Sequence, residues 1–215
     1  MDKLSAKEKY ELKKSEKLER KKEKDGTEKT NGHGKKFLWA FILVALVILL
    51  YLGLKSIVKN NTPQGNDFSR SVPSAGRGHI SVGAVLPEGT YSSNPPSSGP
   101  HYPSTARGGF YDIGEIVEDQ FVVHNLEHGD IWIAYHPGIS KEVKNILENF
   151  GGRYVLVSPR EKNESDIFLV AWQRIDGFSQ EELTKERVKD FILRYDNKGP
   201  EQVRGGGGHQ AGIAN

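Results

Sequence analysis

One apolar run constrains this chain more than any other feature. Residues Phe37–Leu54 are eighteen consecutive residues without a charged side chain. As a helix with a rise of about 1.5 Å per residue, the run would be about 27 Å long, close to the roughly 30 Å hydrocarbon core of a bilayer. A surface helix of a soluble domain keeps a polar face, and this run has none. We therefore expect a single transmembrane helix over residues 37–54.

Charge on the two sides of this run predicts its orientation. Residues 17–36 contain eight Lys and Arg, whereas residues 55–74 contain three. By the positive-inside rule, the amino terminus is then cytoplasmic and the part after the run lies outside the cell. A cleaved signal peptide is the alternative, but its charged region would be 36 residues long and no small-residue cleavage pattern follows Leu54. We expect an uncleaved, single-pass membrane anchor.

Composition divides the rest of the chain. A charged cytoplasmic segment (1–36) precedes the run, a linker (55–78) follows it, and a flexible Gly-rich tail (204–215) ends the chain. Residues 79–203 are enough for one extracytoplasmic domain with a modest core. Residues 55–215 carry 17 Lys and Arg against 20 Asp and Glu, a net charge of −3, so nucleic acid is not an expected partner.

Hydrophobic periodicity in this domain predicts an α+β fold, with a small antiparallel or mixed sheet and helices on one face. Helices are expected over Ser140–Phe150 and over Ser179–Tyr195, where Ser179 and Glu182 form a capping box. Strands are expected where apolar and β-branched residues cluster between turn formers. The expected strands are 120–124, 130–135, 153–158 and 166–173.

The chain has no Cys, and Met1 is its only methionine. Thiolate zinc sites, iron–sulfur clusters and blue-copper centres all need cysteine, and copper(I) sites favour thioethers and thiolates. Any metal bound by this domain is therefore held by imidazole and oxygen.

Two segments carry unusual residue choices. Tyr91–Pro103 contains four prolines and predicts a stiff loop that presents His101, although by itself it is more simply a structural cover over the sheet. The second segment, His124–Gly129, has two histidines four residues apart. In one helical turn His124 and His128 would share a face and could bind one ion, whereas in a strand they would lie roughly 13 Å apart.

The same string matches the His-x-x-Glu-His pattern of the inverted zinc proteases, in which two histidines hold zinc and the glutamate activates water. Those motifs lie on long helices, while the strand-like residues around this one leave room for about one turn. We therefore regard protease chemistry as a minor alternative. His79 and His136 are each expected to be ordinary surface or partly buried residues, with a further ligand as the alternative, and His209 in the tail is expected to be incidental.

Three motifs together, Asn94–Tyr102, Gly109–Tyr111 and His124–Gly129, resemble domain-of-unknown-function family 3105, which comprises membrane-anchored extracytoplasmic domains of bacteria and archaea. The resemblance covers roughly Ile80–Tyr195. It implies an anchor followed by an outside domain, and it supplies no catalytic residues because the family has no established activity.

Function is therefore inferred from the histidines. We expect a divalent metal site, zinc or copper(II), with His101, His124 and His128 as ligands and Glu127 as a ligand or orienting partner. One alternative is a non-catalytic interaction module of the cell envelope, with structural histidines and an unknown partner. The other is a metal-dependent hydrolase in which Glu127 is the general base.

Overall fold

A computed structural model of the protein describes residues 5–201 and 203–204. By its internal contacts the chain forms two compact units, which divide after Ile57. Most of the expected tail, with His209, lies outside the described residues.

The first unit consists of helix α1 (Ala6–Asn60) except for its last three residues, which fall in the second unit. Its segment Gly34–Asn60 has a mean hydropathy of 2.8 over its most apolar part, none of which is buried within the protein. Length and composition make this segment able to cross a membrane. The expectation of one apolar, membrane-spanning helix near the amino terminus is thus supported.

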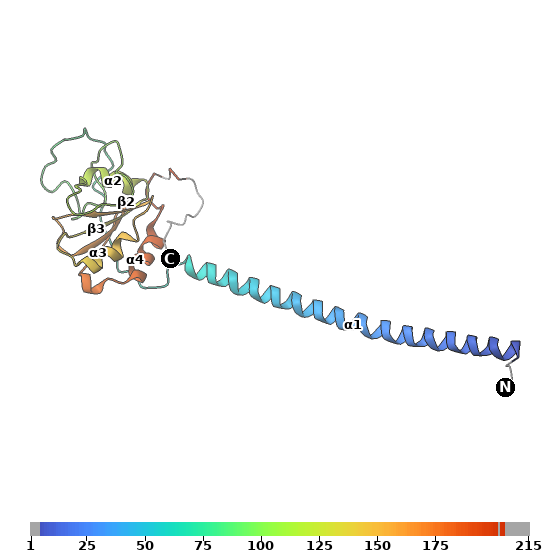
Figure 1. Ribbon diagram of the computed structural model, residues 1–215. Coiled ribbons are helices and arrows are strands. Elements are labelled where there is room, and N and C mark those ends of the chain that lie inside the picture. Colours follow the sequence, from blue (N-terminus) through green and yellow to red (C-terminus); the bar gives the residue numbers. More distant parts are fainter. Residues whose placement is uncertain (1–4, 202, 205–215) are drawn as a thin grey trace. The chain divides into compact units, whose positions relative to one another are not determined.

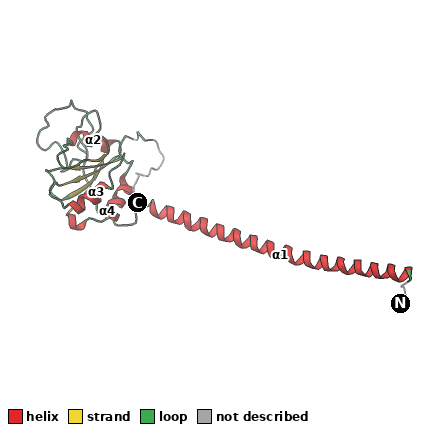
Figure 2. Ribbon diagram, in the orientation of Figure 1, coloured by secondary structure: helices red, strands yellow, loops and turns green. Residues whose placement is uncertain are grey.

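The second unit contains a sheet with helices around it (Figures 1 and 2). Its strands are β1 (Arg70–Ser71), β2 (Gly109–Phe110), β3 (Ile131–Tyr135), β4 (Val155–Pro159), β5 (Ile167–Ala171) and β6 (Arg174–Phe178). Its helices are α2 (Asp119–Glu127), α3 (Lys141–Glu148), the short 3₁₀ helix η1 (Gln180–Glu182) and α4 (Lys185–Tyr195).

The six strands form one mixed sheet in the order β1-β6-β5-β3-β4-β2. Strand β3 is central, parallel to β4 and antiparallel to β5, and β5 forms a hairpin with β6. All five residues of β3 are buried, as expected for a strand covered on both faces. The expected α+β class with a small mixed sheet is confirmed.

The alternation of side chains along β3 separates two hydrophobic clusters. Ile131, Ile133 and Tyr135 face a cluster that includes residues of α3 and α4, while Trp132 and Ala134 face a cluster that includes residues of α2. The two helices expected from periodicity therefore share one face of the sheet (Figure 1). Helix α2 covers the opposite face.

The strand expected over residues 120–124 is wrong, because these residues belong to α2. Phe121, Val122 and Val123 have the β-branched and aromatic character of a strand. Val122 and Leu126 lie one helical turn apart, and both are buried against the sheet. This burial favours a helix over a strand. The helix ends at Glu127 with His128 as its carboxyl cap. The next residue, Gly129, has a φ of +87° that is readily adopted only by glycine, and its N–H donates to the Leu126 carbonyl.

Other differences from expectation occur at short elements. The strand expected over 166–173 is β5, and the strand that follows it, β6, was not expected. The turn between them lies at Gln173, which has a positive φ of 57° but is neither of the usual turn residues, Gly or Asn. The capping box of Ser179 and Glu182 closes only η1, and the following helix begins after Thr184, whose side chain accepts from the Arg187 N–H. The segment expected to be a linker continues α1 to Asn60 and contributes edge strand β1.

Candidate metal centre

The proline-rich loop places His101 beside His79. The two residues form an isolated parallel bridge, in which the His101 N–H donates to the Gly78 carbonyl (3.0 Å) and the Ile80 N–H donates to the His101 carbonyl (2.8 Å). Within this loop Ser97, Ser98 and His101 are buried. The loop is thus packed against the domain, and it delivers His101 to a fixed position.

Helix α2 supplies the other donors. His124 and Glu127 lie in its last turn, and His128 caps its carboxyl end. The Nε2 atoms of His124 and His128 are 3.1 Å apart. Of the two geometries that the sequence left open for this segment, the structure has the compact one, which brings the two imidazoles together.

Four side chains form what we call the inner group: His79, His101, His124 and Glu127. Each offers one ligand atom, and these atoms all lie within 4.8 Å of one another. Zinc–nitrogen bonds of about 2.0 Å in a tetrahedron would set the donors about 3.3 Å apart, so small side-chain movements suffice to surround an ion. His79 is exposed, whereas the other three members are buried.

Backbone carbonyls fix which ring nitrogens face this group. His101 Nδ1 lies 2.8 Å from the Gly99 carbonyl oxygen, and His124 Nδ1 lies 2.7 Å from the Tyr102 carbonyl oxygen. A carbonyl oxygen can only accept, so each Nδ1 carries the hydrogen. In the neutral rings, Nε2 then presents a lone pair. Metal-bound imidazoles are oriented in the same way.

The buried carboxylate of Glu127 is held from two sides. Arg77 Nε donates to Glu127 Oε1 at 2.7 Å, and Glu127 Oε2 lies 2.9 Å from His101 Nε2. That second contact is at ion-pair distance but lacks hydrogen-bond geometry, and His101 Nε2 has no hydrogen-bond partner among the described residues. Two acceptors so close together are stabilised only by a shared proton or a cation. This orphaned nitrogen fits a metal site.

A second set, the outer group, consists of His124, His128 and Glu201. Glu201 Oε2 lies 3.3 Å from His128 Nε2. The segment after α4 reaches this point because the Glu201 N–H donates to the Glu127 carbonyl at 3.0 Å. A side chain at Gly199 would collide with the same carbonyl, so the close approach needs glycine.

The structure divides the four residues expected at the site between the two groups: His101, His124 and Glu127 lie in the inner group, whereas His128 shares the outer group with His124 and not with His101. Of the two further candidates, His79 joins the inner group, while His136 belongs to neither group among the described residues and accepts from the Gly138 N–H. Sequence reasoning missed Arg77 and Glu201. No local pattern marks either residue, because only the folded chain brings them to α2.

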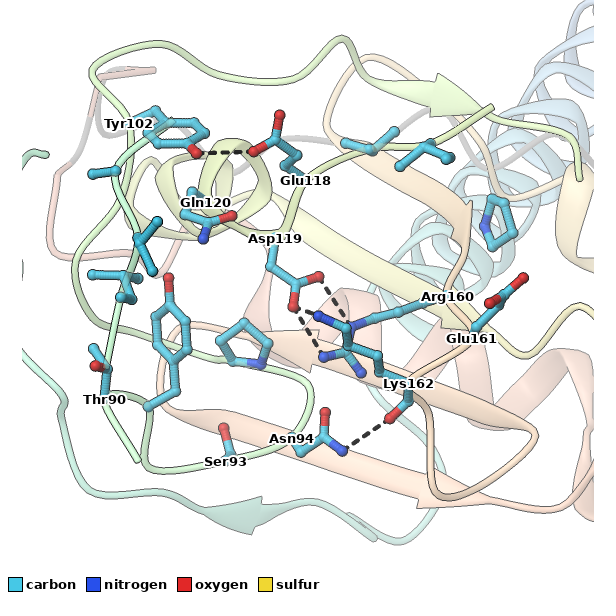
Figure 3. Close-up of a pocket in the computed structure, with 18 of the residues that line it drawn as sticks. Thr90, Ser93, Asn94, Tyr102, Glu118, Asp119, Gln120, Arg160, Glu161 and Lys162 are labelled. Atoms are coloured by element: carbon cyan, nitrogen blue, oxygen red, sulfur yellow. Dashed lines mark hydrogen bonds and ion pairs between the residues drawn. The ribbon is translucent and has the colours of Figure 1, made fainter. Parts of the chain in front are cut away.

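The start of α2 faces a different feature, a cavity of about 1160 Å³ that Figure 3 shows. Glu118 and Asp119 line it, and they accept hydrogen bonds from Tyr102 and Arg160 respectively. Burial, aided by Asp119 and Tyr102, raises the pKa of Tyr91 in the same lining to about 12, so this phenol stays protonated. Tyr102 connects the cavity to the inner group, because its backbone carbonyl orients His124.

Electrostatics at the centre favour a neutral His124. Burial lowers the pKa of His124 below its ordinary value, and the neighbouring imidazoles lower it further, while the bond to the Tyr102 carbonyl opposes the shift. A neutral imidazole is the form that binds a metal.

We expect the metal-free protein to lose stability as the pH falls. Because the pKa of folded His124 lies below its unfolded value, the stability that this residue contributes is complete above about pH 6.5 and is lost as the pH falls toward the folded pKa. Urea unfolding with a chelator present, followed by near-UV circular dichroism at about pH 7.5 and about pH 5.5, measures the loss. The loss should be smaller in His124→Gln. An equal loss in both proteins would contradict this role of His124.

Comparison with known proteins identifies the domain. Residues 87–206, more than half of the chain, match the family described as Protein of unknown function (DUF3105). No curated protein and no solved structure is significantly similar to the chain. The match covers His101, α2 and Glu201, whereas Arg77 and His79 precede it. The chain therefore belongs to the DUF3105 family of proteins of unknown function.

Proposed function

We propose that this protein is a membrane-anchored metal-binding protein whose inner group holds one divalent transition-metal ion. The observation that carries the proposal is the convergence of His101 Nε2, His124 Nε2 and a buried carboxylate oxygen, with both Nδ1 atoms committed to backbone carbonyls. Structural histidines in a core normally have both ring nitrogens satisfied, whereas His101 Nε2 has no hydrogen-bond partner within residues 5–201 and 203–204.

The donor set narrows the choice of metal. Three imidazoles and one carboxylate match the ligand preferences of zinc and copper(II), and they are too rich in nitrogen for calcium or magnesium. With four donors the inner group is able to complete a tetrahedral zinc site. Arg77 holds Glu127 Oε1, which favours a ligand or orienting role for Glu127 over that of a free general base. Binding, rather than hydrolysis, is therefore the function we propose.

Metal titration of the chelator-treated chain in detergent tests this proposal. We expect wild-type protein to bind about one Zn²⁺ and to unfold at a higher temperature when Zn²⁺ is present. His101→Gln removes a buried donor, so its affinity should fall by about 100-fold or more, since even outer partners of metal ligands contribute 10–100-fold. His136→Gln, which changes a histidine outside both groups, is the matched control and should bind like wild type.

The interaction-module alternative makes the opposite prediction. If the histidines are purely structural, His101→Gln lowers the unfolding temperature equally with and without Zn²⁺, and the wild-type protein has no more than weak affinity for the ion. Such a result, with Cu²⁺ giving the same answer, would refute the proposed metal site.

We also propose that the metal-binding domain lies outside the cytoplasmic membrane, anchored by α1. Support comes from the excess of Lys and Arg before the apolar segment: residues 17–36 carry eight and residues 55–74 carry three. The same polarity leaves the segment before residue 37 in the cytoplasm.

Because the chain has no cysteine, single-cysteine variants test this topology directly. Ser15 and Glu142 are both exposed, on the two sides of the apolar segment. In intact cells a membrane-impermeant maleimide should label Glu142→Cys, and it should label Ser15→Cys only after lysis. Labelling in the reverse pattern, or equal labelling of both variants, would contradict the proposed orientation.

A further inference from the structure

We infer that the outer group is a capture position, which takes an ion from solution and passes it to the inner group through their shared ligand, His124. This inference rests on the proposed function and adds to it a route for the metal. It concerns residues that the proposed site does not itself require, His128 and Glu201.

Apart from His79, which is exposed, the donors of the inner group are buried more deeply than those of the outer group. The side chains of Glu201 and His128 are 38% and 25% exposed, whereas those of Glu127 and His101 are 2% and 0% exposed. A hydrated ion therefore reaches Glu201 and His128 before it reaches Glu127 and His101. In the part of the chain that the structure describes, the outer group offers two donors besides His124, a number suited to holding an ion that keeps some of its water.

His124 belongs to both groups but has one lone pair to give. Its Nδ1 is committed to the Tyr102 carbonyl, so Nε2 is the only nitrogen available to a metal. Nε2 lies 3.1 Å from His128 Nε2, and His124 is also a member of the inner group. The two positions therefore compete for one nitrogen. An ion at the outer group completes its transfer when His101 and Glu127 replace His128 and Glu201 around it.

Arg77 connects the carboxylates of the two groups. Its Nε donates to Glu127 at 2.7 Å, and its Nη2 lies 3.5 Å from a Glu201 oxygen. One guanidinium thus holds both acidic ligands near His124 and balances their charge. A dication arriving at either position weakens the hold of Arg77 on that carboxylate, since both cations compete for the same oxygens.

Zn²⁺ association with the full chain in detergent, measured by stopped flow against a chromophoric chelator, tests the route. In the double variant His128→Gln/Glu201→Gln, the association rate should fall by about tenfold or more, because the exposed anionic capture point is gone. Release should slow by the same factor, since the route serves both directions, so the equilibrium affinity stays close to that of wild type.

His101→Gln should instead lose affinity, and His136→Gln should change neither rate. Glu201→Gln alone, at a half-exposed side chain, repeats the test if the double variant does not fold.

Three results would overturn the route while leaving the proposed function intact. An unchanged association rate in the double variant would show that the outer group captures nothing. A loss of affinity as large as that of His101→Gln would make His128 and Glu201 ligands of the final site. Two Zn²⁺ ions bound at once to the wild-type chain would contradict competition for His124. By contrast, a wild-type chain that binds no Zn²⁺ refutes the proposed function, and the inference with it.

Discussion

Two hydrogen bonds from ring nitrogens to backbone carbonyls underlie the whole account of this site. Gly99 and Tyr102, on the proline-rich loop, accept from Nδ1 of His101 and of His124. These bonds fix the tautomer of each neutral ring. They leave His101 Nε2 facing Glu127 at 2.9 Å and His124 Nε2 facing His128 at 3.1 Å. The loop therefore supplies more than one histidine, because its backbone also orients a ring from α2. Such outer contacts raise ligand basicity and determine which nitrogen meets a metal.

The fold explains why these contacts persist. Helix α2 is held between the sheet, where Val122 and Leu126 are fully buried, and the proline-rich loop. The first residues of α2 line the cavity of about 1160 Å³, and its last turn carries the metal-binding candidates His124 and Glu127. The segment after α4 then closes on the helix terminus, where the Asn197 N–H donates to the Gly129 carbonyl at 2.8 Å. The site is thus assembled from four separate stretches of chain: Arg77 and His79, the proline-rich loop, the end of α2, and Glu201.

The sequence predicted the parts of the structure that local patterns control. Hydrophobic periodicity predicted the apolar helix, helix α3 and the central strands β3, β4 and β5. This pattern is informative because apolar side chains must be buried on one face. The helical structure of α2 was not predictable, because Phe121-Val-Val is compatible with either a strand or a helix. The contacts of these residues with the sheet favour the helix. His101, His124 and His128 were predictable as candidates from the chemistry of imidazole. The partnership of Arg77 and Glu201 was not, since it depends on contacts across 50 residues or more of chain.

X-ray absorption at the zinc edge of the fully loaded chain tests the central claim most directly, because it reports the atoms that surround the ion. The account predicts three imidazole nitrogens and one carboxylate oxygen at about 2.0–2.1 Å, with the scattering of one ring missing in His101→Gln. A spectrum without scattering from several imidazole rings, or one that His101→Gln leaves unchanged, would contradict the proposed centre.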